Sequence, residues 1–332
     1  MNALCRSGSH HLDFLCVQAL RHSVLHNEET NVTARLSNIR TVTALITPFA
    51  GDDLNRSALA TLVDCQVRAG IDAVIVCDVT GEGYALSDYE RDTVLSTCLE
   101  RAEGRLAVLA ATSTYGTGRS IALSERAQQL GADGLLVTVP YYSKPTKAGV
   151  ASHFRNIAEA THLPIIIDDD PQRTVIEGGA ALLSALSDVH NVVGVRHGAG
   201  RLAAFARLDP VLRRRYHHYC ADEVDLPAFL ACGAHGMMSS YGNLFPFRLA
   251  AVGRGFAGAA GQFRREMAAL LEATGGQWDA AVIKAACAIL HGDSENVRLP
   301  MVGLDDEMRE AVRRVLVSLE AAAGELASQT VA

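Results

Sequence analysis

Polar and ionisable side chains directly follow several short apolar runs in this chain of 332 residues. If these runs are parallel strands of one closed sheet, the residues after them converge on one face. Carboxylates, guanidinium groups and hydroxyls gathered there can hold an acid and transfer protons. The residues at these positions are Thr80 and Glu82, Tyr141 and Tyr142, Asp168 to Asp170 with Arg173, Arg196 with His197, and Asp222 with Glu223.

The predicted strands and helices that must position these residues alternate regularly from residue 41 onward. Apolar runs alternate with helical stretches, and each run is short and continuous, which is typical of parallel strands buried on both faces. Eight such units over roughly 220 residues predict an α/β fold of the TIM (β/α)8 barrel type. An open doubly wound sheet is the alternative, but no glycine-rich dinucleotide turn follows the first run. The predicted strands cover residues 41–47, 73–77, 106–111, 134–139, 164–167, 192–195, 217–220 and 236–239.

Local signals mark where several helices begin and where the barrel ends. Asn55 is a suitable N-cap for a helix through Ala69, and Ser87 with Glu90 predicts a capping box. After about residue 255 the strands stop, and residues 257–274, 280–291 and 305–323 predict a C-terminal helical extension. We therefore expect three parts: an N-terminal extension over 1–38, disordered or a short helix, the barrel over 39–255, and the helical region over 256–332.

Composition and net charge exclude several classes of binding partner for this protein. The net charge of −7 argues against a nucleic-acid surface, and no apolar run reaches the ~18 residues that a membrane span needs. The eight cysteines contain no CxxC pair, which favours free thiols in the cytoplasm over disulfides or a structural zinc site. We expect a small-molecule partner and neither a nucleic acid nor a membrane.

Several motifs give the chain a family resemblance from about residue 41 to about residue 325. It resembles the dihydrodipicolinate synthase/N-acetylneuraminate lyase family in the order and spacing of these motifs. They are Ala44-Leu45-Ile46-Thr47-Pro48-Phe49, Thr80-Gly81-Glu82, Pro140-Tyr141-Tyr142 with Pro145, Pro171-Gln172-Arg173-Thr174, Val193-Gly194-Val195 and Arg298-Leu299-Pro300-Met301.

The resemblance implies a reaction and an assembly. Members of this family are class I aldolase-type lyases or synthases that bind pyruvate, or a related 2-keto acid, as a Schiff base on a lysine at the end of the sixth strand. They use no other cofactor, and they are usually homotetramers built from tight dimers. The resemblance thus implies a pyruvate-like 2-keto acid as ligand, a homo-oligomer, dimer or tetramer, and no bound metal.

Part of the family's site is carried over to this chain. Thr80 matches the second of two threonines in a loop whose backbone amides, with that of Gly81, hold the keto-acid carboxylate. Tyr142, or its neighbour Tyr141, matches a proton-relay tyrosine that crosses the dimer interface. Arg173 matches an arginine that binds a substrate carboxylate.

Three positions depart from the family. Val79 stands where the first threonine is expected, Asp168 where a proton-shuttling tyrosine is expected, and Arg196 where the lysine is expected. A Schiff base needs a neutral primary amine, whereas a guanidinium group with a pKa of about 13 stays protonated and is weakly nucleophilic. We therefore expect no ordinary dihydrodipicolinate synthase turnover. Because strands five and six should be neighbours, we expect a bidentate ion pair between Asp168 and Arg196.

The sequence leaves the role of this site open. Arg196 and Arg173 could hold an acid without a covalent bond, with Asp168 as base, or the Asp168–Arg196 pair could fill a former site in a non-catalytic homologue. The lysine could also have moved, since the chain has three, Lys144, Lys147 and Lys284.

A metal-assisted lyase or hydratase is a further alternative. Its candidate ligands are oxygen donors and one imidazole near the expected barrel mouth. They have no HxH or HxxxH spacing, which weakens this reading. These residues are Asp168, Asp169, Asp170, Asp222, Glu223 and His197.

Overall fold

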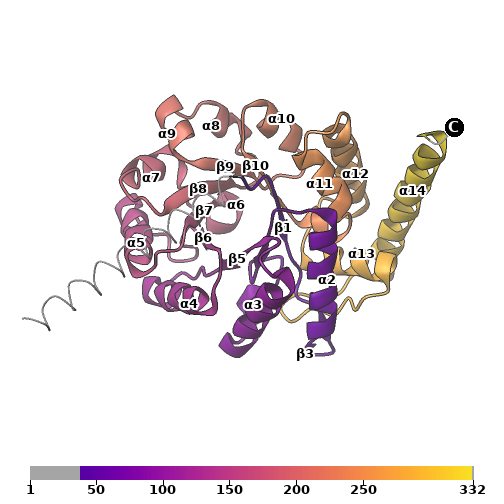
Figure 1. The fold of residues 1–332 in the computed structure, drawn as a ribbon, viewed down its shortest axis with the longest axis horizontal. Helices are drawn as coiled ribbons and strands as arrows, with labels where there is room; N and C mark the ends of the chain where they lie inside the picture. The colour runs from indigo at the N-terminus through magenta and orange to yellow at the C-terminus, as the bar shows by residue number, and fades with distance from the viewer. Residues whose placement is uncertain (1–37, 331–332) are drawn as a thin grey trace, which may run out of the picture. The chain divides into compact units, whose positions relative to one another are not determined.

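Eight parallel strands close into a barrel in the computed structural model, which describes residues 38–330 (Figure 1). The strands follow one another around the barrel in chain order, and the last, β10, pairs with the first, β1. The predicted TIM barrel is confirmed. The strands are β1 (Thr41–Ala44), β4 (Ala73–Val76), β5 (Ala107–Ala111), β6 (Gly134–Thr138), β7 (Ile165–Asp169), β8 (Val192–His197), β9 (His217–Cys220) and β10 (Gly236–Ser239).

Helices surround the barrel on its outer side (Figure 1). The side chain of Asn55 caps the first of them, and Ser87 and Glu90 form the predicted capping box. A short hairpin of β2 (Phe49–Ala50) and β3 (Asp53–Leu54) follows the first barrel strand. The helices are α2 (Arg56–Ala69), α3 (Asp88–Ala102), α4 (Thr117–Leu130), α5 (Lys147–Ala160), α6 (Pro171–Thr174), α7 (Gly179–Ala185), α8 (Leu202–Ala206), α9 (Pro210–Arg215), α10 (Leu226–Ala231) and α11 (Pro246–Gly253), with the 3-10 turns η1 (Gly83–Ala85) and η2 (Ser240–Asn243).

The hydrophobic core explains why the strands read as continuous apolar runs. All residues of β1, β4 and β5 are buried, because one side of each strand faces the barrel interior and the other faces the helices. Each fully buried valine, leucine or isoleucine contributes about 1.5–3 kcal/mol relative to exposure. The barrel is therefore a rigid support for the loops at its carboxyl ends.

Two strands run further than the apolar pattern predicts. β7 includes Asp168 and Asp169, and β8 includes Arg196 and His197, with Asp168 paired to Arg196 and Asp169 to His197 in the sheet register. Successive side chains of a strand point to opposite faces. Asp168 and Arg196 therefore face the barrel interior, whereas Asp169 and His197 face the surrounding helices.

Three further helices follow the barrel, as predicted: α12 (Ala259–Ala273), α13 (Ala280–His291) and α14 (Asp306–Thr330). The last extends beyond its predicted end at residue 323. In the described part of the chain, no helix combines the length and apolarity that crossing a bilayer requires. The division into barrel and helical region at residue 255 stays a prediction, and the predicted N-terminal extension lies outside the described residues except for its last.

Candidate functional site

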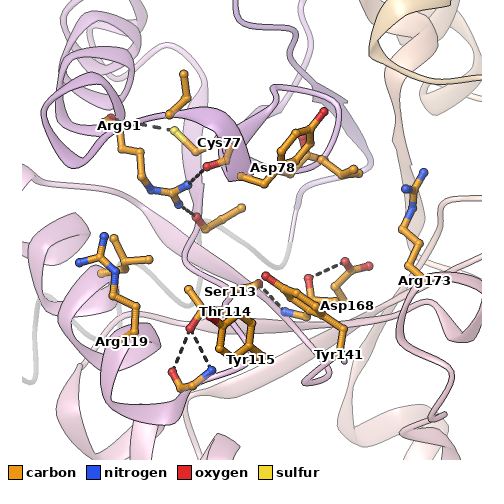
Figure 2. Close-up of a pocket in the computed structure, with 18 of the residues that line it drawn as sticks. Cys77, Asp78, Arg91, Ser113, Thr114, Tyr115, Arg119, Tyr141, Asp168 and Arg173 are labelled. Carbon is orange, nitrogen blue, oxygen red and sulfur yellow. Dashed lines mark hydrogen bonds between the residues drawn. The ribbon is translucent and has the colours of Figure 1, made fainter. Parts of the chain in front are cut away.

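A cavity of about 700 Å³ opens at the carboxyl ends of β4, β5, β6 and β7 (Figure 2). This is the end of a barrel where binding and catalytic residues usually gather. Carboxylates, guanidinium groups and hydroxyls line the cavity beside apolar groups. Its polar lining side chains include Asp78, Arg91, Ser113, Thr114, Tyr115, Arg119, Thr138, Tyr141, Asp168 and Arg173.

Arg196 is not itself a lining residue, but it contacts two of the carboxylates that line the cavity. Its Nη1 is 3.5 Å from Oδ2 of Asp78, and its Nε is 3.7 Å from Oδ1 of Asp168. Asp78 comes two residues after the end of β4, which lies four strands from β8 in the eight-stranded barrel. The contacts of Arg196 therefore reach across the barrel interior. Thr138 donates a hydrogen bond of 2.9 Å to the other oxygen of Asp168.

The expected bidentate pair between Asp168 and Arg196 is wrong in its geometry. The guanidinium group is shared between two carboxylates, and Nε makes no hydrogen bond. Asp78 was absent from the sequence-based candidates for this site. Its place directly after an apolar strand is the same signal that marked Asp168, but its partner lies 118 positions away in the sequence.

Neighbouring carboxylates keep Arg196 protonated despite its burial. Burial acts to lower its pKa, but the carboxylates of Asp168 and Asp78 outweigh burial and raise the pKa above its usual value. For Asp78, burial raises the pKa of the carboxyl group, and the positive charge of Arg196 partly offsets that rise. A guanidinium group held in this way is an electrostatic partner and not a nucleophile.

The loop after β4 already binds a carboxylate from its own chain. The backbone N–H of Gly81 donates to Oδ1 of Asp78 at 3.1 Å, and Thr47 Oγ1 donates to the carbonyl oxygen of Gly81. Thr80 is buried, and Val79 lines the cavity. An amide that the family resemblance assigns to a substrate carboxylate is thus engaged by Asp78.

A buried ion pair between Glu82 and Lys284 stabilises the same loop after β4. Lys284 Nζ on α13 lies 2.5 Å from Oε1 of Glu82 and 4.0 Å from the ring centre of Phe49, and both charged side chains are fully buried. The backbone N–H of Arg298 donates to the other oxygen of Glu82. Burial lowers the pKa of Lys284, with Glu82 opposing it. These contacts give Lys284 a structural role.

The other two lysines are solvent-exposed. Lys144 lies in the loop after β6 with a positive φ of 48°, and Lys147 begins α5. Neither belongs to the residues that line the cavity described above. The geometry gives no support to a Schiff-base lysine displaced to either position.

The tyrosine pair after β6 is divided between two environments. Tyr141 lines the cavity and packs edge-on against Tyr115 with ring centres 5.9 Å apart (Figure 2). Tyr142 is 88% exposed and adopts a positive φ of 64°. Of these two neighbouring tyrosines, Tyr141 is therefore the one that lines the cavity within a single chain.

Arg173 stands at the edge of the cavity with its side chain 52% exposed. Its Nε lies 3.4 Å from Oδ2 of Asp170, the residue that caps α6. An exposed guanidinium group with one long contact has donors available for a ligand.

The candidate metal ligands do not converge. His197 lies outside the barrel, where its Nε2 is 2.9 Å from Nδ1 of His218 and its ring packs near Phe205 and Phe229. Asp169 accepts hydrogen bonds from the amides of Gly178 and Gly179. Strand alternation sends both residues away from the cavity.

The two candidate metal-binding acids after β9 already accept hydrogen bonds from their own chain. Asp222 accepts from the amide of Gly200, and Glu223 accepts from the side chain of Ser239 and from Ser240. Within residues 38–330, no three His, Cys, Asp or Glu side chains are grouped to hold a metal ion.

Known proteins resemble this chain over most of its length. The model of the dihydrodipicolinate synthetase family matches residues 37–319. The 4-hydroxy-tetrahydrodipicolinate synthase of Sorangium cellulosum is 34% identical over 288 residues, which cover 85% of this chain and 96% of that protein.

Solved structures agree with the sequence comparison. Dihydrodipicolinate synthase from Aquifex aeolicus is 30% identical with a TM-score of 0.78, over 85% of this chain and 98% of that one. The chloride-inhibited dihydrodipicolinate synthase from Acinetobacter baumannii, complexed with pyruvate, is 26% identical with a TM-score of 0.79, over 85% and 99% of the two chains. The barrel, the motifs and these matches together place the chain in the dihydrodipicolinate synthetase family.

Proposed function

We propose that this protein binds a small carboxylic acid in the cavity without forming a Schiff base, and that it lacks ordinary dihydrodipicolinate synthase activity. The observation that carries this proposal is the guanidinium group of Arg196 between Asp78 and Asp168. In this proposal Arg196 occupies the position of the family's lysine. A charged, shared guanidinium group cannot supply the neutral amine that the covalent step needs.

The residues at the cavity edge support an acid as ligand. Arg173 has free donors at the edge of the cavity, and Tyr141 offers a hydroxyl in the same cavity. Pyruvate is bound in the Acinetobacter baumannii relative. Pyruvate-like 2-keto acids are therefore the first acids to test.

A second candidate function is catalysis by a changed mechanism. Asp168 lines the cavity, and Thr138 fixes one of its oxygens. A carboxylate held in this way can act as a general base toward a bound acid, as in a lyase or hydratase. We also propose a homodimer or homotetramer, because Tyr142 exposes a large aromatic ring beside the site. The scattered cysteines without a CxxC pair support the cytoplasm as its compartment.

Borohydride trapping with pyruvate, followed by mass spectrometry, tests the covalent step. We expect no reduced adduct on this protein, whereas a lysine-bearing synthase of the family is labelled in parallel. An adduct on Lys144, Lys147 or Lys284, or normal condensation of pyruvate with aspartate semialdehyde, would overturn the proposal.

Calorimetric titration of small carboxylic acids tests the binding step. Arg173→Ala should weaken binding of any acid that binds by at least about tenfold, since a charge-assisted hydrogen bond contributes roughly 1.5–3 kcal/mol. Arg207→Ala is the matched control, because Arg207 is exposed and lies outside the residues that line the cavity. Equal loss in both variants would place the acid elsewhere.

A further inference from the structure

The inner wall of the cavity carries more negative than positive charge. Asp78 and Asp168 both line the cavity, and each side chain is 10% exposed or less. Both share the single guanidinium group of Arg196. Asp170 and Glu223 add further negative charge around that group.

Two carboxylate oxygens on this wall keep accepting capacity. Oδ2 of Asp78 and Oδ1 of Asp168 have their guanidinium contacts at 3.5 and 3.7 Å. Charge-assisted hydrogen bonds between nitrogen and oxygen are normally about 2.7–2.9 Å long. The guanidinium group therefore leaves both oxygens without a short charge-assisted hydrogen bond from its own donors.

The positive groups of the cavity lie elsewhere on its wall. Arg173 is at the exposed edge, and Arg119 is paired with Asp88. Arg91 donates from Nη1 to the carbonyl oxygen of Gly83 and from Nη2 to that of Ala111, so both of its terminal nitrogens are held by the backbone. The cavity thus has an acidic inner end and a basic opening.

We propose that the ligand is a small zwitterion, an α-amino acid, whose ammonium group faces Asp78 and Asp168 and whose carboxylate faces Arg173. This inference rests on the proposed function and names the group at the other end of the acid. An ammonium group supplies three donors and the charge that the inner wall lacks. A keto oxygen or a second carboxylate would meet the two aspartates without a donor, and a carboxylate would also be repelled.

Matched pairs of acids test this charge arrangement on the unmodified protein. Pyruvate and L-alanine share their carbon skeleton and differ at C2, as do 2-oxoglutarate and L-glutamate. Calorimetric titration at pH 7.5 should give at least a tenfold lower Kd for the amino acid in at least one pair. Propionate, which lacks the ammonium group at C2, should bind at least tenfold more weakly than L-alanine.

Asp168→Asn adds a second readout, because the amide keeps an acceptor for Thr138 and removes the charge. We expect it to weaken the amino acid at least tenfold while leaving the keto acid within about threefold; thermal unfolding of the variant shows whether it is folded. Tighter binding of the keto acid in both pairs overturns this inference and leaves the proposed function standing. Absence of binding by every acid overturns both, and amino-acid binding that a folded Asp168→Asn protein retains overturns the assignment of the ammonium group.

Discussion

Replacing Arg196 with methionine tests the central electrostatic feature of this protein. The variant keeps a long side chain in the barrel interior and removes the guanidinium group that Asp78 and Asp168 share. We expect a large loss of stability, because two carboxylates with little exposure are left facing the barrel interior without a cation.

The contact distances set the size of this effect. At an effective dielectric constant of about 20, unit charges separated by the 3.5 Å between Arg196 and Asp78 attract by roughly 4–5 kcal/mol. Removing one member of a buried ion pair costs about 3–5 kcal/mol overall, since the partner's desolvation is no longer compensated. For a large domain this corresponds to a fall in Tm of about 6–20 °C.

The loss should depend on pH with a defined sign. Burial already raises the pKa of Asp78, and Arg196 opposes that rise, so the variant's folded state should bind a proton more tightly than its unfolded state. The destabilisation is then complete above the folded pKa and shrinks as pH falls toward the unfolded value of about 3.9. Arg196→Met should lose more stability at pH 8 than at pH 5.

Urea unfolding followed by circular dichroism, at both pH values, measures this difference. The control adds Asp78→Asn and Asp168→Asn to the variant, which removes the uncompensated charges and should restore most of the lost stability at pH 8. A loss below about 1 kcal/mol, or one that is the same at both pH values, would refute the ion-pair reasoning.

Three further predictions concern the same barrel. Arg196→Lys alone should give no borohydride-trapped adduct with pyruvate at pH 7, since the two adjacent carboxylates hold the new ammonium group protonated; labelling of that lysine would contradict this. Lys284→Met should destabilise the protein by about 3–5 kcal/mol by stranding the Glu82 charge, and adding Glu82→Gln should recover part of the loss in urea unfolding. Burial lowers the pKa of His197 to about 3 and that of His218 to about 4, so both are neutral when folded, and their contribution should be complete above pH 6.5 and decline as pH falls toward 4. A variant with glutamine at both histidine positions should have a flatter stability profile between pH 6.5 and 5, and equal slopes would argue against this origin.

Local sequence signals were enough to predict the architecture. Short apolar runs require burial on both faces, and eight of them alternating with helices leave a closed parallel barrel as the fitting arrangement. The caps at Asn55 and at Ser87 with Glu90 depend on residues three positions apart or fewer, so they are predictable from the sequence alone. The helices after the barrel were found for the same reason, because their propensities are local.

The sequence by itself predicted Asp168, Arg196 and Arg173 at the barrel mouth, and it determined that the sixth barrel strand ends in Arg196-His197 without a lysine. Only the tertiary structure decided how these groups are used. Strand alternation turned Asp169 and His197 outward, although they are adjacent to inward-facing residues. Closure of the barrel brought Asp78 to Arg196 across the interior and Lys284 to Glu82 beneath the loop. These pairings join residues more than a hundred positions apart, and such contacts depend on the path of the whole chain, which local patterns do not encode.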